Sequence, residues 1–164
     1  MTRRIGIATV FVVGLAVVGL AAAGVNRNWS THSNGSMEVP VRDSQGQSQA
    51  IFHLSKDGDA LDFKLIASNI AGVTQSHIHC GHPGENGPVV VFLYGVNAAG
   101  ISPSGVLNQG TITNSNVIAR PSTAICPGGI ADLDDVIEKM NTGGAYVNVH
   151  TIQFPGGEIR GDIK

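Results

Sequence analysis

Alternation of apolar and polar residues is the dominant pattern along this chain, and it predicts short β-strands. In Gln49–Ser55 the even-numbered positions are apolar or small and share one face, while His53 shares the opposite face. Asp57 and Gly58 then form a strong hairpin signal. Alternation resumes in Leu61–Leu65, which we expect to be the returning strand of the hairpin.

Four further stretches have the length and composition of strands: Thr74–Cys80, Pro88–Tyr94, Ala145–Thr151 and Glu158–Ile163. The valine-rich second stretch lacks alternation, which is typical of a strand buried on both faces. Residues 97–110 show no periodicity and resemble a loop. Together the strands predict an all-β domain of two packed layers.

One segment has a helical period instead. Leu133, Val136, Ile137 and Met140 are spaced i, i+3, i+4 and i+7, which places them on one face of a helix. Gly143 follows and can end the helix. The fold is therefore expected to contain one short helix.

The N-terminus is apolar without alternation. Ile5–Val25 contains about 21 apolar or small residues, enough to span roughly 31 Å as a helix and so to cross a bilayer. Arg3 and Arg4 precede it and should stay in the cytoplasm. Ala21–Ala23 also offers a signal-peptidase site, so residues 1–25 are either a transmembrane anchor or a signal peptide. Both alternatives predict an extracytoplasmic protein, membrane-anchored or secreted.

The segment at residues 26–36 is polar and resembles a linker, so the folded domain is expected to comprise residues 37–164. Its first element would be an edge strand at Met37–Val41, because Pro40 cannot donate a ladder hydrogen bond. The net charge is −2 with neutral histidines. Without a basic field, nucleic acid is excluded as a partner class.

Cys80 and Cys126 are the only cysteines, and export to an oxidising compartment would allow them to form a disulfide. Such a bond closes a loop of about 47 residues and would contribute roughly 4 kcal/mol. Two alternatives stay open at this point. The thiols could be unpaired, or Cys80 could be a copper thiolate ligand beside its neighbouring histidines.

Histidines provide the candidate chemistry. His77 and His79 lie two residues apart on a predicted strand, so both project to one face while Ile78 projects to the other. His150 likewise projects from the strand face opposite to that of Val147 and Val149. If the two strands are neighbours, three imidazoles converge outside the apolar core, as in copper or zinc sites.

His82, in the turn that follows, could be a fourth ligand. The alternative is that all these histidines are solvated surface residues. The sequence contains neither a G-x-S-x-G nor an H-E-x-x-H motif, so no hydrolase constellation is identified.

Three ordered motifs resemble a known family: E-V-P from Glu38, S-H-I-H-C-G-H-P-G-E-N-G-P-V-V-V-F-L from Ser76, and G-G-A-Y-V-N-V-H-T with F-P-G-G-E-I-R-G-D-I near the C-terminus. They are similar to the CHRD domain, first named in chordin. The resemblance covers Met37–Lys164. It implies an all-β, Greek-key or immunoglobulin-like sandwich or barrel, distantly similar to the Cu/Zn superoxide dismutase fold.

In superoxide dismutase an H-x-H strand and later histidines hold copper, and this implies His77, His79 and His150 as ligands here, with zinc the less favoured metal. A zinc-binding loop with a carboxylate ligand has no counterpart in this sequence. Two functions follow. One is an exported copper protein, either superoxide-dismutase-like or concerned with copper storage or delivery. The other is a non-enzymatic surface module that binds a protein partner or a second copy of itself.

Overall fold

The computed structural model describes residues 26–164. Residues 1–25, for which the sequence predicts an anchor or signal peptide, lie outside this range. Within residues 26–164, no helix is long and apolar enough to span a membrane.

Eight strands, one α-helix and two 3₁₀ turns make up the described part of the chain. The strands are β1 (Asn28–Asn34), β2 (Gln47–Leu54), β3 (Leu61–Ser68), β4 (Val73–Cys80), β5 (Val89–Tyr94), β6 (Gly105–Ile112), β7 (Ala145–Thr151) and β8 (Ile159–Asp162). The helix is α1 (Leu133–Thr142), and the 3₁₀ turns are η1 (Gly35–Met37) and η2 (Asn114–Asn116).

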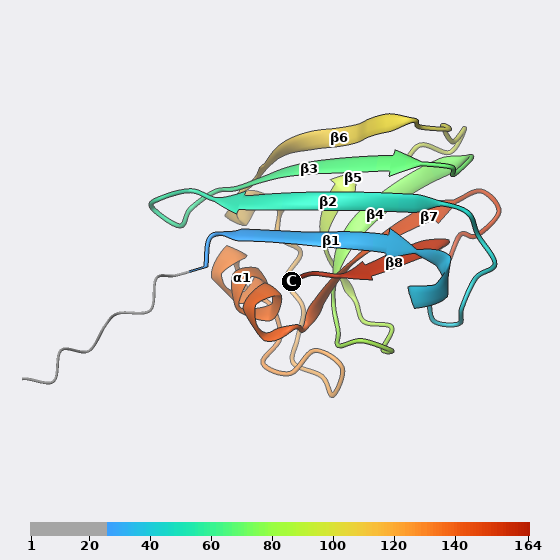
Figure 1. The fold of residues 1–164 in the computed structure, drawn as a ribbon. Coiled ribbons are helices and arrows are strands. Elements are labelled where there is room, and N and C mark those ends of the chain that lie inside the picture. Colours follow the sequence, from blue (N-terminus) through green and yellow to red (C-terminus); the bar gives the residue numbers. More distant parts are fainter. Residues whose placement is uncertain (1–25) are drawn as a thin grey trace, which may run out of the picture.

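All strand pairs are antiparallel, in the order β5-β4-β7-β8-β1-β2-β3-β6. Figure 1 shows β1, β2, β3 and β6 as one layer in front, with β4, β5, β7 and β8 crossing behind it. The layers join where β8 meets β1, at Asn34 and Arg160. At the opposite edges, the Asn108 side chain of β6 donates a 2.6 Å hydrogen bond to the Leu93 carbonyl of β5. The result is a sandwich that is nearly closed into a barrel, which confirms the predicted fold class.

Alternation correctly identified the core side of these strands. Phe52 and Leu65 are completely buried inside the barrel, whereas Ile51 is 43% exposed on the outside. Ile78, Val147 and the other inward residues of β4 and β7 are also buried. The apolar inner faces of the two layers therefore pack against each other and form the core, as expected from the burial of apolar area.

The structure differs from the sequence expectations in three places. The stretch expected to be a linker contains β1, whose inward-facing residues are Trp29, Thr31 and Ser33. The predicted edge strand at Met37–Val41 is wrong, because this segment leaves η1 as irregular chain. The predicted loop at residues 97–110 contains most of β6. β1 escaped detection because two of its three inward side chains are small and polar.

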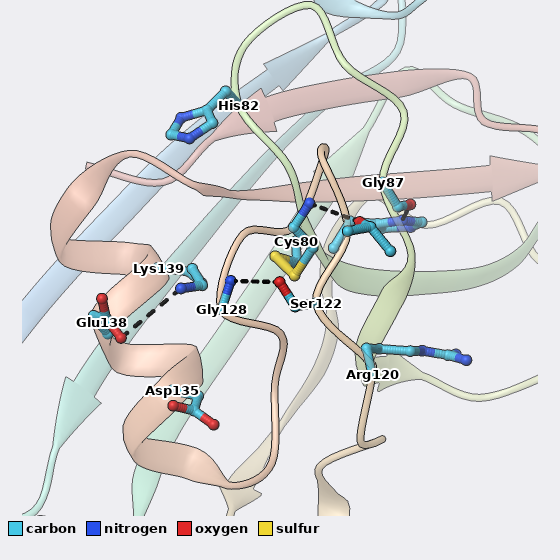
Figure 2. Close-up of a disulfide and its surroundings, with 12 residues drawn as sticks. Cys80, His82, Gly87, Arg120, Ser122, Gly128, Asp135, Glu138 and Lys139 are labelled. Atoms are coloured by element: carbon cyan, nitrogen blue, oxygen red, sulfur yellow. Dashed lines mark hydrogen bonds and ion pairs between the residues drawn. A yellow bond between two sulfur atoms is a disulfide. The ribbon is translucent and has the colours of Figure 1, made fainter.

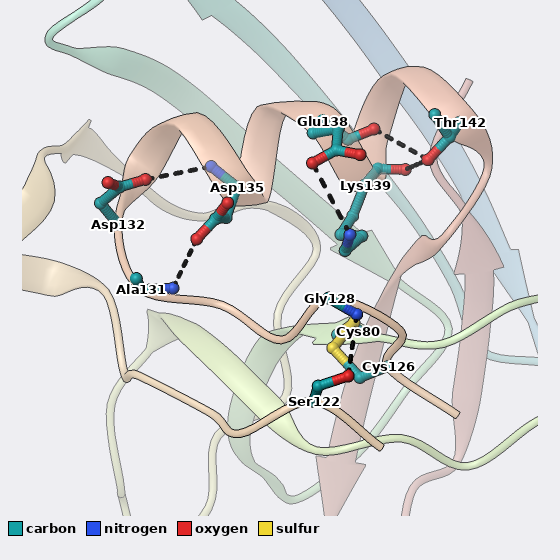
Figure 3. A network of polar contacts seen from close by, with 10 residues as sticks. All are labelled: Cys80, Ser122, Cys126, Gly128, Ala131, Asp132, Asp135, Glu138, Lys139 and Thr142. Atoms are coloured by element: carbon teal, nitrogen blue, oxygen red, sulfur yellow. Dashed lines mark hydrogen bonds and ion pairs between the residues drawn. A yellow bond between two sulfur atoms is a disulfide. The ribbon is translucent and has the colours of Figure 1, made fainter. Parts of the chain in front are cut away.

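The predicted helix is present as α1, and its four periodic residues are buried. It begins at Asp132, whose side chain accepts a hydrogen bond from the backbone N–H of Asp135 (Figure 3). It ends at Gly143, which has a left-handed φ of 72°. Trp29 of β1 donates from its indole to Asn141, which fastens the helix to one end of the barrel.

Cys80 and Cys126 form the anticipated disulfide (Figures 2 and 3). It joins the end of β4 to the segment 117–130, which runs along the free edge of β5 and bridges it at Val91 and Val117. Because each sulfur is bonded to the other, neither is a thiolate. The alternative of Cys80 as a copper ligand is therefore wrong.

Candidate metal centre

Three histidines converge on the outer face of neighbouring strands β4 and β7. His77 is paired with Asn148 and Gln75 with His150, so His150 lies on the same face as His77 and His79. The candidate ligand nitrogens of His77, His79 and His150 all lie within 4.8 Å of one another. We call these three residues the histidine triad. Their convergence was expected if the two strands were neighbours, and the structure makes them so.

The triad is buried, which differs from the expected open, outward site. His77, His79 and His150 are only 2%, 8% and 7% exposed. On one side the Phe92 ring of β5 lies edge-on to His77, with 4.4 Å between ring centroids. The sheet face is thus covered rather than solvated, and these rings are not incidental surface histidines.

Burial keeps the triad neutral. It lowers the pKa of His77 from its ordinary 6.5 to about 3, with the nearby His150 and His79 lowering it further. Burial also lowers the pKa of His79 to about 4 and that of His150 below its ordinary value. All three imidazoles are consequently unprotonated at neutral pH, which is the form that binds metals.

Two backbone carbonyls set the orientation of the rings. His79 Nδ1 lies 2.9 Å from the Gly87 carbonyl oxygen, and His150 Nδ1 lies 2.9 Å from that of Pro155. A carbonyl can only accept, so each neutral ring carries its proton on Nδ1 and its lone pair on Nε2. The carbonyls act as the outer partners that commonly orient metal-binding histidines.

His77 is oriented by its neighbour in the triad. Its Nδ1 lies 3.1 Å from His150 Nε2, and because that atom carries a lone pair, His77 Nδ1 is the donor. The Nε2 atoms of His77 and His79 are then buried lone pairs with no hydrogen-bond partner. Because buried polar atoms usually have a partner, these two lone pairs are available to a ligand.

A stack of side chains supports the triad from one side. The Tyr146 ring lies parallel to His79 at 4.8 Å, and the Arg160 guanidinium lies 3.5 Å above the other face of Tyr146. The Tyr146 hydroxyl accepts a hydrogen bond from the Gly87 N–H. Gly87 therefore contacts both rings, through its N–H and its carbonyl.

Arg160 also fastens the turn that carries Gly87. It is 1% exposed, and its guanidinium donates to the carbonyls of Glu85 at 2.6 Å and His82 at 2.9 Å. Two charge-assisted bonds to one turn hold that turn against the sheet. The position of the His79 partner carbonyl thus depends on an arginine from β8.

His82, the proposed fourth ligand, is not brought to the triad. Its side chain is exposed, and in Figure 2 its ring points away from Gly87. Only its backbone carbonyl takes part in the site, as an acceptor for Arg160. Within residues 26–164, the triad is the only group of three or more potential ligand side chains close enough to share an ion.

Several residues of the site were missed from the sequence. Tyr146 and Asn148 alternate with inward valines and share the face of His150, so strand periodicity could have identified them. Asn148 bonds to the buried carboxylate of Glu38, whose pKa is raised by burial. No sequence signal marks the carbonyls of Gly87 and Pro155, because any residue has a carbonyl.

Comparison with known proteins gives one assignment. No curated protein and no solved structure matches this chain. The family model of the CHRD domain matches residues 29–163, from the second residue of β1 to the residue after β8. The chain therefore belongs to the CHRD domain family.

Proposed function

We propose that this protein is an exported copper-binding β-domain with His77, His79 and His150 as ligands. The observation that carries the proposal is a buried cluster of neutral imidazoles whose candidate ligand nitrogens lie within 4.8 Å of one another, with two of the rings oriented by carbonyls. Imidazole is a good ligand for copper and zinc. Copper is favoured by the H-x-H strand and distant histidine, an arrangement similar to that of superoxide dismutase.

Bound copper would supply one-electron chemistry, such as superoxide dismutation, or would simply be stored and delivered. The chain's own residues would bind and orient it. The carbonyls of Gly87 and Pro155 hold the Nδ1 protons of their histidines, and Phe92 restricts water at His77. Rigid strands carry all three ligands, so little conformational entropy is lost on binding.

Export is supported by the Cys80–Cys126 disulfide, because such bonds persist in oxidising compartments. The apolar residues 1–25 would direct export, either as an uncleaved anchor or as a signal peptide. The mass of the mature protein, measured from its native host, distinguishes the two. An intact N-terminus in the membrane fraction indicates an anchor.

Metal analysis of the full-length protein tests the proposal. The protein is incubated with Cu(II), or with Cu(II) plus ascorbate, then dialysed and assayed for copper. About one copper per chain is expected, and His150→Ala should abolish it. His82→Ala is the matched control, since His82 is an exposed histidine in the turn that follows β4, and this variant should bind copper normally. Equal copper content in the wild type and His150→Ala would contradict the proposal. Turnover requires a separate superoxide assay.

The second candidate function, a protein-binding module, has its own structural support. Ile101 and Ile152 are exposed and flank the start of β4 from two sides, where Ile101 pairs with Val73 and Ile152 bonds to Gly72. Exposed apolar clusters often mark contact surfaces. Sedimentation of the wild type and of Ile152→Ser tests self-association. A monomeric wild type at high concentration argues against a homo-oligomer.

A further inference from the structure

The triad offers a metal three neutral imidazoles and no charged ligand, and His150 Nε2 must release its hydrogen bond from His77 Nδ1 to bind the metal. The two cysteines are bonded to each other and provide no thiolate, and His82 is exposed outside the cluster. Each triad ring is hydrogen bonded only to a carbonyl or to another ring, and none to a carboxylate. The number and the charge of these donors both bear on which ion the site prefers.

Three nitrogen donors suit some ions better than others. Cu(II) favours tetragonal surroundings with at least four ligands, and Zn(II) is almost always four-coordinate. Cu(I) has a filled d shell and no tetragonal preference, so three imidazoles can satisfy it. Phe92 packs against His77 and Tyr146 against His79, and the three histidines are at most 8% exposed.

The charged side chains near the triad also favour an ion of low charge. The guanidinium groups of Arg160 and Arg120 both disfavour positive charge at His79. Arg120 is held in place by its Nε–H, which donates 2.7 Å to the Val89 carbonyl, directly across from His79. The buried carboxylate of Glu38 bonds instead to Asn148 and to a backbone N–H.

The cost of burying an ion rises steeply with its charge, because desolvation scales with the square of the charge. A divalent ion at the triad would bring two positive charges into a covered site near two arginines, Arg120 and Arg160, of which Arg160 lies 3.7 Å from the Asp162 carboxylate. A monovalent ion would bring one. No anionic ligand is present in the described cluster to offset the difference.

We propose that the histidine triad binds copper as Cu(I), in preference to both Cu(II) and Zn(II). This inference rests on the proposed function, that the triad is a copper site, and specifies the oxidation state it stabilises. A site of this kind takes its metal from a donor that delivers cuprous ion. It also keeps the copper reduced.

The test compares the three ions on the full-length protein. Under anaerobic conditions Cu(I) affinity is measured by competition with bicinchoninate, and Cu(II) and Zn(II) affinities by competition with nitrilotriacetate. We expect one Cu(I) per chain, with a dissociation constant at least about 100-fold below those of Cu(II) and Zn(II), which corresponds to about 2.7 kcal/mol. His77→Ala should lose Cu(I) binding. His32→Ala, an exposed histidine of β1, should retain it.

The results separate the two proposals. Cu(II) or Zn(II) bound as tightly as Cu(I), with His77→Ala abolishing binding, would overturn the cuprous preference and leave the metal site in place. Failure of all three ions to bind would overturn the site and the preference together. X-ray absorption of protein loaded with Cu(I) under argon provides a second readout: a Cu(I) edge with three nitrogen neighbours supports the proposal, and a Cu(I) edge with fewer than three nitrogen neighbours contradicts it.

Discussion

The two layers of the barrel have contrasting outer faces. In β2 buried and exposed residues alternate regularly, and the outward His53 is an exposed residue that bonds to Asn28 at 2.7 Å. In β7 all seven residues are buried, and the outward His150 contacts the triad and the Pro155 carbonyl. One face is open to water, and the other is covered by turns.

The contrast shows what makes a histidine chemically useful in this fold. His53 and His77 both occupy outward positions of alternating strands, yet one is exposed and the other is 2% exposed. The cover comes from chain segments distant from β4, including the turn at Pro155 and the segment around Glu38. Burial removes the proton from the rings and leaves their lone pairs available.

The largest difference should be seen in copper affinity. His79→Ala removes a proposed ligand on the covered face and should weaken copper binding by more than about 100-fold, since even second-sphere changes typically cost 10–100-fold. His53→Ala, on the open face, should leave affinity unchanged. Competition titrations of both variants measure this. Similar losses in the two variants would show that the faces are equivalent.

Loss of the disulfide should have the next largest effect. Replacing Cys80 and Cys126 by alanine together releases the segment that borders β5, and should lower the free energy of unfolding by about 4 kcal/mol. Urea denaturation, compared with the oxidised wild type, provides the measurement. An unchanged midpoint would mean that this segment is held in place without the bond.

Gly87→Ala should disturb the turn that packs against His79 and Tyr146. A Cβ at residue 87 would lie 1.6 Å from the Cys80 carbonyl oxygen, so the turn must move and both Gly87 contacts with His79 and Tyr146 are altered. Copper affinity should fall about 10–100-fold. Gly95→Ala is the matched control, because nothing lies within 4 Å of its Cβ. Equal affinities would show that the Gly87 carbonyl is not needed to orient His79.

The covered face should also make stability depend on pH. The pKa of His77 is about 3 in the folded domain and near 6.5 when unfolded, so between these values the unfolded chain binds more protons. Stability is therefore lost as pH falls from about 6.5 toward 3, by up to about 1.4 kcal/mol per pH unit for each such histidine. Metal-free urea unfolding at pH 7, 6 and 5 tests this. His77→Gln should reduce the slope, and an unchanged slope would contradict the assignment.

The smallest effect is expected on the open face. Ile51→Thr replaces an outward side chain of β2 that is 43% exposed, and should change the free energy of unfolding by less than about 0.5 kcal/mol. Ile78→Ala, at a completely buried position of β4, should cost about 2–5 kcal/mol. Thermal denaturation compares the two variants. A large effect at Ile51 would indicate that this face is covered too, for example by a partner.

Much of the fold was predictable because the spacing of apolar residues shows which side of a strand or helix faces the core. The alternation around Phe52, the period of α1 and the two cysteines each led to features that the structure contains. β1 was not predictable, since Thr31 and Ser33 point inward without being apolar. Of the site, the three histidines could be predicted, but the roles of the Gly87 carbonyl and of the hydrogen bonds from Arg160 to the turn could not.

The sequence by itself determined which way each side chain points, because a strand repeats every two residues. It thereby placed His77 and His79 on one face and put Ile78 in the core. Only the tertiary structure decided that β7 lies beside β4, and that turns from elsewhere in the chain cover the pair. Those contacts join residues up to 110 positions apart, such as Glu38 and Asn148, and no local pattern records them. Local periodicity thus sets the direction of a histidine, whereas long-range packing sets its environment and its chemistry.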